Sequence, residues 1–385
     1  MTRSRGRVCF YSPYLYPVAT GGEIEFVGGT EVRQWALARG LAERGFEVVV
    51  ATCDYGQGAV LVRDGVTLLR TYSTREGFPG IRLFYPRLWK AMRTLRRAGA
   101  DVYIANGAGI PAGWAYDAAR SARARFVFMA SSDTDAMNSL PFLANRRERW
   151  WYLRGLRGAD ARVAQTELQR QLFRDNFSVE TEVIANPVEL PANPVDAGAN
   201  SLVLWLSTYK PSKRPEWFSE LAQRLPQYRF VMAGFSGSDA GGDSWFAAQR
   251  ASALSSNLEV NGFVEHGRIG EFLSKTALFV HTSPVEGFPM TLLEAWAYGI
   301  PSVSAVDPGG TIGRNRIGEV VSSFDELVET VGGLMRDPDR RRVAGNQARE
   351  YVSDHHGPDR TYEPLGALLD RVISAVPREI SARRR

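Results

Sequence analysis

The sequence predicts an α/β protein made of two doubly wound, Rossmann-like domains, each built on a parallel sheet. Its length is the first observation behind this, because 385 residues exceed what one hydrophobic core comfortably holds. The second is that short apolar runs alternate with amphipathic segments through both halves, which is typical of parallel sheets covered by helices. The third is the stretch 186–200, which is rich in Pro, Asn, Ala and Gly and indicates a linker.

The first half, residues 1–190, is expected to form the first of these domains. A helix from about Thr30 to Arg44 carries apolar residues at a helical period and lies between two strand-like runs, which predicts a βαβ unit. Apolar runs that predict strands are RVCFYSP, FEVVVAT, VTLLRT, DVYIAN, RFVFMA, ARVAQT and TEVIAN.

The second half, residues 191–357, repeats this alternation. Its predicted strands are SLVLWLS, RFVMAG, LEVNGF and ALFVHT, and its predicted helices lie over PEWFSELAQRL, DSWFAAQRASAL and GRIGEFLSK. Residues 358–385 form a third unit, a helix from Pro358 followed by a basic tail.

The composition favours an anionic partner, because the net charge is +5. No zinc-finger, helix-turn-helix or RNP signature accompanies this charge, so nucleic acid is not expected as a partner. The two cysteines, Cys9 and Cys53, lie in or beside apolar runs and are interpreted as reduced core thiols. No signal peptide and no apolar run of about twenty residues occurs, so a cytoplasmic protein is expected.

Basic residues gather in two segments that also carry large aromatic residues, 81–97 and 145–162. In the first, Leu88, Met92 and Leu95 share one helical face, and arginines and a lysine fill the others. One interpretation is interfacial binding to an anionic membrane surface, which would make the protein peripheral on the cytoplasmic face. The other is a helix that covers a parallel sheet and turns its basic side to water.

Two carboxylates, Glu286 and Glu294, lie eight positions apart across the start of a predicted helix. Glu286 sits in a loop after the run ALFVHT and Glu294 one to two turns into the helix, so both can border one crevice. Free backbone N–H groups at the helix start would bind an anion such as a diphosphate. These donors are Gly287, Phe288, Met290 and Thr291. The alternative is a structural helix with an acidic first turn and an exposed glutamate.

This motif, EGFP with the two glutamates in an E-x7-E register, resembles the retaining glycosyltransferases of family 4 (glycosyl transferases group 1), which have the GT-B fold. Segments in the family's order strengthen the resemblance over about residues 7–355: GGTEVRQWALARGLAERGFEVVVAT, KPSKRPEWFSELA, VNGFVEHGRIGEFL and DPGG. The resemblance implies two domains facing a central cleft, and a last helix, in 358–385, that crosses back onto the first domain. It assigns Glu286 to the donor sugar as a catalytic residue, and Glu294 to the ribose hydroxyls.

The resemblance also implies a phosphate site. Gly28 and Gly29, just before the first helix, would approach the distal phosphate through their amides. Lys213 aligns with the family's catalytic lysine that neutralises the diphosphate. The family's usual arginine, five residues earlier, is Thr208 here, and Lys210 is the candidate substitute, without arginine's bidentate fork. The alternative for both lysines is a solvated turn.

The acceptor side departs from the family. Many relatives carry a histidine after the strand RFVFMA, where this chain reads SSDTDAM. Ser131, Ser132 and Asp133 are therefore candidates for binding the acceptor or the transferring sugar, with a capped turn as the alternative. No His, Cys and carboxylate cluster has metal-ligand spacing, so no metal and no other cofactor are expected.

These residues predict a retaining transferase that moves a sugar from a nucleotide diphosphate to a hydroxyl of a glycan, a lipid-linked or a small-molecule acceptor. Envelope polysaccharide, exopolysaccharide or glycolipid synthesis is the expected context. Two alternatives stay open. A GT-B nucleotide-sugar epimerase would use the same cleft without an acceptor, and a non-catalytic nucleotide-sugar-binding protein would fit Thr208 and the absent histidine.

Overall fold

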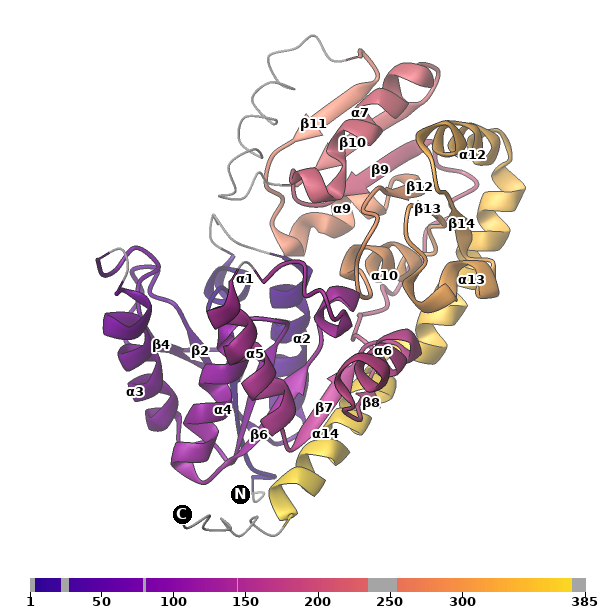
Figure 1. Cartoon of the computed structure of the whole chain (residues 1–385). Helices are drawn as coiled ribbons and strands as arrows, with labels where there is room; N and C mark the ends of the chain where they lie inside the picture. Colours follow the sequence, from indigo (N-terminus) through magenta and orange to yellow (C-terminus); the bar gives the residue numbers. More distant parts are fainter. Residues whose placement is uncertain (1–3, 22–27, 79–80, 144, 235–254, 376–385) are drawn as a thin grey trace.

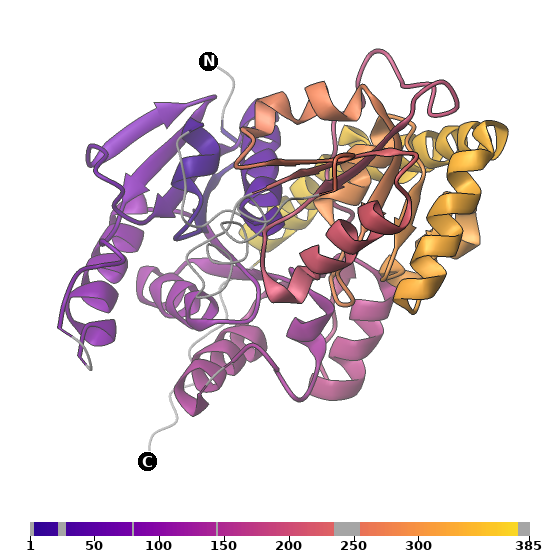
Figure 2. The same cartoon turned by 90° about the horizontal axis from the view of Figure 1, so that it is seen from above.

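The computed structural model describes residues 4–21, 28–78, 81–143, 145–234 and 255–375 (Figure 1). It consists of two α/β domains, each with its own mainly parallel sheet, which confirms the predicted fold class. Figure 2 views the two domains from above. The helix expected over DSWFAAQRASAL and the basic tail lie outside the described residues.

The first sheet has eight strands in the order β3-β4-β2-β1-β5-β6-β7-β8, and within it only the β3–β4 pair is antiparallel. Its strands are β1 (Arg7–Tyr11), β2 (Glu47–Thr52), β3 (Val60–Arg63), β4 (Val66–Arg70), β5 (Val102–Asn106), β6 (Arg125–Met129), β7 (Ala161–Ala164) and β8 (Glu182–Val183). Strand β3 was not predicted. It pairs through the two-residue turn Asp64–Gly65, whose φ angles of 49° and 76° suit a hairpin that follows the sheet's twist.

Helices cover both faces of the first sheet. Side chains of α3, α4, α5 and α6 pack on one face, and those of α2 pack on the other. The helical elements of this domain are α1 (Tyr16–Thr20), α2 (Gly29–Glu43), η1 (Leu83–Leu88), α3 (Trp89–Ala98), α4 (Ile110–Ala122), η2 (Asp133–Ala136), α5 (Arg146–Gly158) and α6 (Glu167–Phe177). In α3, Leu95 is buried and Met92 packs beside it, so this basic segment does cover the sheet.

Helices α4 and α5 approach each other closely because Gly113 and Gly155 lie at their contact. A Cβ at Gly155 would lie 2.6 Å from the carbonyl oxygen of Ala112, which is backbone and cannot rotate away. We expect Gly155→Ala to lower the free energy of unfolding by about 1–3 kcal/mol. The matched control is Gly333→Ala, in another helix with no atom within 4 Å of the added Cβ, which should be neutral or slightly stabilising. Chemical denaturation of both variants measures the difference, and equal stabilities would contradict this packing.

The second sheet has six parallel strands in the order β11-β10-β9-β12-β13-β14. Its strands are β9 (Leu202–Leu206), β10 (Arg229–Ala233), β11 (Leu258–Asn261), β12 (Thr276–His281), β13 (Ser302–Ser304) and β14 (Gly318–Val320). In the described residues after β9, the helical elements are η3 (Pro211–Lys213), α7 (Pro215–Arg224), η4 (His266–Arg268), α9 (Ile269–Leu273), α10 (Met290–Ala297), η5 (Pro308–Gly310), α11 (Thr311–Asn315), α12 (Phe324–Arg336), α13 (Pro338–His356) and α14 (Pro358–Ser374).

The chain crosses between the domains twice. Residues 184–201, without helix or strand, join β8 to β9. Helix α14 then runs back along the first domain (Figure 1), where the Tyr362 hydroxyl donates to the Ala36 carbonyl at 3.2 Å and the Arg44 guanidinium lies over the Tyr362 ring. In the described part of the chain, no helix is both long and apolar enough to cross a bilayer.

Candidate active site

Glu286 and Lys213 meet at the carboxyl edge of the second sheet. Glu286 follows β12, Lys213 follows β9, and these strands are neighbours, so the two loops leave the sheet side by side. Lys213 Nζ forms an ion pair with Glu286 Oε1, and only 24% and 17% of the two side chains is exposed. The structure therefore brings together the two residues predicted as catalytic.

The environment of Glu286 keeps its carboxylate ionised. Burial alone would raise its pKa, but the positive charge of Lys213, the interaction with His281 and hydrogen bonds from Lys213 and Ser283 together outweigh burial and hold the pKa below its ordinary value. His281 Nε2 lies 3.7 Å from the same carboxylate oxygen. Burial lowers the pKa of His281 to about 4, so at neutral pH its ring is uncharged. The result is a partly desolvated anion with one cationic partner.

The loop that carries the lysines is fixed to the end of β12. Trp205 Nε1 donates to Thr282 Oγ1 at 2.9 Å, and that hydroxyl donates to the carbonyl of Lys213. Lys210 lies near the first domain, where its charge opposes the rise that burial causes in the pKa of Glu31. Thr208, at the position of the family's arginine, accepts a backbone hydrogen bond from Lys210 at 2.8 Å.

Glu294 lies in the middle of α10, with 13% of its side chain exposed. Burial raises its pKa, and the nearby His266, whose Nδ1 lies 3.7 Å from Glu294 Oε1, opposes the rise. The second glutamate of the motif is thus a recessed acceptor and not the exposed helix residue of the structural alternative. The proximity of the His266 ring was not predicted.

The N-terminus of α10 offers fewer donors than the sequence predicted. The Phe288 N–H donates to Gln165 Oε1 of the first domain at 2.8 Å, so the prediction that this donor is free was wrong. Gln165 stands directly after β7 and reaches across the domain boundary. The N–H groups of Gly287, Met290 and Thr291 have no hydrogen-bond partner among the described residues, so three of the four predicted donors remain.

The N-terminus of α2 faces that of α10. A Cβ at Gly29 would lie 3.7 Å from Met290 Cγ, which places the two helix starts against each other. Gly28 is the N-cap of α2, and its N–H donates to Glu31 Oε2 at 3.0 Å. The Gly28 amide, which the resemblance assigns to the distal phosphate, is thus engaged in this structure, because the sequence GGTE forms a capping arrangement that uses this donor.

The acceptor-side candidates divide into two groups. Ser131 and Ser132 belong to a capped turn, as the alternative interpretation had it: both amides donate to Asp135 Oδ2, at 2.8 and 3.1 Å, and the Ser132 hydroxyl caps η2. Asp133 instead faces the loop that carries Glu286, and its N–H donates to the carbonyl oxygen of Glu286 at 3.3 Å.

The Asp133 side chain accepts a hydrogen bond from Gln169 Nε2 at 2.9 Å. Burial raises its pKa to about 6. Its sequence neighbours Ser132 and Thr134 line a cavity of about 280 Å³, together with Glu31, Asn106 and Ser131.

Several residues that shape the site escaped the sequence analysis. Gln165 Oε1 accepts a hydrogen bond at the contact between the domains, and Gln169 holds Gln165 in place. A Cβ at Gly287 would lie 2.8 Å from the backbone carbonyl oxygen of Ser131, which cannot rotate away, so this close approach favours glycine. Arg33 is buried and donates to the Ala130 carbonyl at 2.7 Å beneath the serine turn. A sequence signal for Gln165 was available, because it is a polar residue directly after an apolar strand run, as ARVAQ shows.

Comparison with known proteins decides the family. Residues 27–191 match the model of Glycosyltransferase Family 4, and residues 194–351 match that of Glycosyl transferases group 1. This chain belongs to the family 4 glycosyltransferases. An uncharacterised glycosyltransferase of Haemophilus influenzae is 22% identical over 228 residues, which is 54% of this chain and 61% of that relative.

Solved structures of other glycosyltransferases share the fold. Sucrose-phosphate synthase from Thermosynechococcus elongatus has a TM-score of 0.81 at 17% identity, over 97% of this glycosyltransferase and 100% of that chain. Anabaena HepE in complex with UDP-glucose has a TM-score of 0.73 at 17% identity, over 94% and 99%. Staphylococcus aureus TarM in complex with UDP has a TM-score of 0.60 at 17% identity, over 74% and 59%. These likenesses support the two-domain GT-B fold.

Proposed function

We propose that this glycosyltransferase transfers a sugar from a nucleotide diphosphate to a hydroxyl acceptor with retention of the anomeric configuration. The observation that carries the proposal is the ionised, partly buried Glu286, paired with Lys213 beside two helix N-termini. HepE in complex with UDP-glucose and TarM in complex with UDP share the fold, and they support a uridine diphosphate sugar as the donor.

Each residue of the site then has a defined role. Glu286 orients the donor sugar and stabilises positive charge at its anomeric carbon, without a covalent bond to it. Lys213 offsets the negative charge that develops on the departing diphosphate, and the free amides at the start of α10 bind its oxygens. A donor phosphate oxygen accepts the acceptor proton on the same face. Lys210 and the start of α2 at Gly29 complete the phosphate site.

The neutralising charge in this proposal comes from the chain itself, so no metal and no other cofactor is required. The acceptor enters from the first domain, beside Asp133 and the cavity of about 280 Å³. We propose a glycan or lipid-linked acceptor in envelope polysaccharide or glycolipid synthesis, with the protein in the cytoplasm and attached to the cytoplasmic face of a membrane.

The test incubates the full chain with a panel of nucleotide sugars, with and without chelator and candidate acceptors, and follows the anomeric protons of the products by NMR. The proposal expects nucleotide release that depends on an acceptor and is insensitive to chelator, and an α-linked product from an α-linked donor. An epimerised donor without acceptor would establish the epimerase alternative. Donor binding without any turnover would establish the non-catalytic one.

Glu294 is expected to act in binding and not in chemistry. A recessed carboxylate that accepts hydrogen bonds from the ribose hydroxyls contributes about 1.5–3 kcal/mol for a charged partner. Glu294→Ala should therefore weaken UDP binding roughly 10- to 100-fold, while kcat at saturating donor changes little. Calorimetry with UDP measures the first and steady-state rates the second. Unchanged affinity for UDP would show that the nucleoside binds elsewhere.

A further inference from the structure

A second cavity lies outside the active site, on the outer side of the first domain. It has a volume of about 480 Å³ and lies between the β3–β4 hairpin and α3. The charged residues that line it are mostly basic: five are cationic and one, Asp54, is acidic. The cations are Arg7, Arg70, Lys90, Arg93 and Arg97. Nothing in the proposed transfer reaction uses this cavity.

The cations of the cavity differ in how far their charge is already compensated. Lys90 pairs with Glu76, and Arg70 lies 3.7 Å from Asp54. Arg93 and Arg97 are exposed, and neither forms an ion pair with any residue in the described ranges. The Arg93 guanidinium instead lies 5.5 Å from the centroid of the Trp89 ring. An anion that enters the cavity therefore meets two guanidinium groups whose charge is not yet neutralised.

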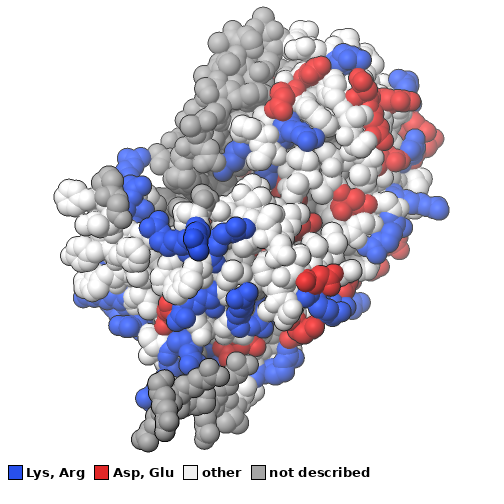
Figure 3. Space-filling model, in the orientation of Figure 1, with Lys and Arg blue, Asp and Glu red and all other residues white. Residues whose placement is uncertain are grey.

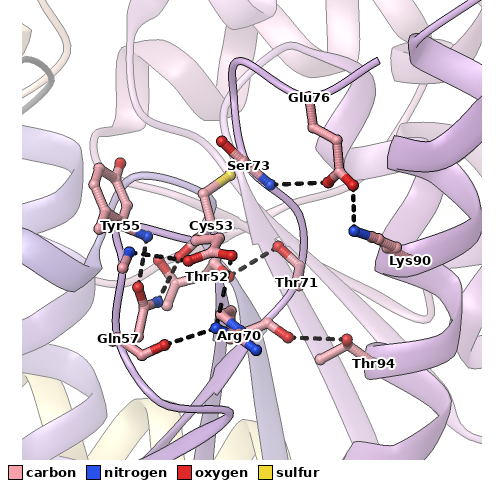
Figure 4. A network of polar contacts seen from close by, with 12 residues as sticks. Thr52, Cys53, Tyr55, Gln57, Arg70, Thr71, Ser73, Glu76, Lys90 and Thr94 are labelled. Carbon is pink, nitrogen blue, oxygen red and sulfur yellow. Dashed lines mark hydrogen bonds and ion pairs between the residues drawn. The ribbon is translucent and has the colours of Figure 1, made fainter.

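Hydrogen bonds hold the walls of the cavity in place. Figure 4 shows Arg70 and Thr94 on facing elements, with the Thr94 hydroxyl donating to the Arg70 carbonyl at 3.1 Å. The Arg70 guanidinium donates to the carbonyl of Gln57 at 2.9 Å. The hairpin and α3 are thus tied together before any ligand arrives, which lowers the entropic cost of binding.

A row of exposed apolar side chains adjoins the cavity. Phe78, Ile81, Phe84, Tyr85 and Trp89 are each more than half exposed, and Trp89 also lines the cavity. Residues 78–99 hold six cations and no acid. Figure 3 shows basic side chains next to uncharged ones along the left edge, where Figure 1 places α3. Large apolar side chains exposed together beside cations are typical of interfacial membrane binding.

We propose that this cavity binds the phosphate headgroup of an anionic membrane lipid, while the aromatic side chains of 78–89 insert into the headgroup boundary. Arginine suits this role because its planar guanidinium group can donate two parallel hydrogen bonds to phosphate oxygens. The exposed aromatic row favours a lipid over a soluble phosphate, which would need no apolar neighbour. The inference deepens the membrane attachment proposed above, and its lipid contact does not depend on the transfer chemistry.

The position of the segment also fits a lipid-linked acceptor. The chain leaves the carboxyl end of β4 at Thr71, and in a parallel sheet this is the edge from which the loops after β5 and β6 also leave. A membrane bound there would lie beside the first-domain half of the active site. This consequence, unlike the lipid contact, rests on the proposed function.

The test is sedimentation of the full chain with vesicles of phosphatidylcholine alone and with phosphatidylglycerol added. We expect binding only to the anionic vesicles, weakened by salt. Arg93→Gln/Arg97→Gln should weaken it roughly 25-fold, at about fivefold for each cation near an anionic surface. The matched control is Arg224→Gln/Arg336→Gln, which removes the same charge from exposed last-turn arginines of α7 and α12 and should bind like the parent.

The aromatic contribution has its own variant. Trp89→Ser should weaken vesicle binding about tenfold and leave the remaining binding more sensitive to salt, because only the electrostatic part is left. Equal binding to neutral vesicles, or equal losses in the control pair, would overturn the proposal. Displacement from vesicles by free glycerol 3-phosphate at the lipid concentration would also overturn it, in favour of a soluble phosphate. We expect the affinity for UDP to stay unchanged in every variant. A loss of vesicle binding can then be told apart from a failure of the donor site.

Discussion

Glu286→Gln is expected to lower kcat for sugar transfer by about 10²–10³-fold, the usual cost of losing one preorganised electrostatic group at a reacting centre. Glutamine keeps the size and shape of the side chain but removes the charge that would stabilise the anomeric carbon. The effect should be large here because the carboxylate is mostly buried and its pKa is held low, so at neutral pH it is fully ionised.

The measurement is single-turnover transfer at saturating donor, with calorimetry of UDP alone beside it. UDP lacks the sugar that Glu286 contacts, so its affinity should stay within about threefold of the parent value. Glu319→Gln serves as the matched control, because this glutamate is 41% exposed and pairs with Arg340 on the surface. Full activity in Glu286→Gln would remove Glu286 from the reaction and with it the proposed mechanism.

Much of the fold was predictable because parallel strands buried on both faces form continuous apolar runs. Strands such as β1 and β9 and the helix α2 follow directly from such runs and from helical periodicity. Strand β3 was missed because its burial is low: Val60 and Val62 are exposed, so its pattern resembles a loop. The dipeptide Asp64–Gly65 was the available signal. Strands β13 and β14, of three residues each, are too short to show a period of two.

The site was predictable where the chemistry lies within one motif. Glu286 and Glu294 were predicted from their spacing across the start of one helix, whereas Lys213, in a separate segment, was assigned through the resemblance to the family 4 glycosyltransferases. The error at Phe288 and the unforeseen engagement of the Gly28 amide have a common cause. A sequence shows that an N–H lies at a helix start, but not which side chain accepts from it, and here Glu31 and Gln165 do. The Gln165 contact joins residues 123 positions apart, a separation that no local pattern reveals.

Lys213→Met is expected both to slow transfer and to move its pH dependence. With the ammonium group gone, burial becomes the dominant influence on Glu286 and raises its pKa above the ordinary value. The carboxylate must be ionised to act, so the acidic limb of kcat/KM should shift to higher pH by about 1–3 units. The rate at neutral pH should fall about 10²-fold or more, because the leaving diphosphate also loses its cation.

The matched control is Lys210→Met, which removes the same charge from the same loop at a position whose charge acts on Glu31. It should weaken donor binding without moving the acidic limb. Removing one partner of a buried pair destabilises a fold by about 3–5 kcal/mol, so unfolding is measured alongside. In Lys213→Met/Glu286→Gln no buried charge is left alone, and this variant should regain stability but not activity. An acidic limb that stays in place in a folded Lys213→Met would mean that another group sets the pKa of Glu286, and that the ion pair is structural.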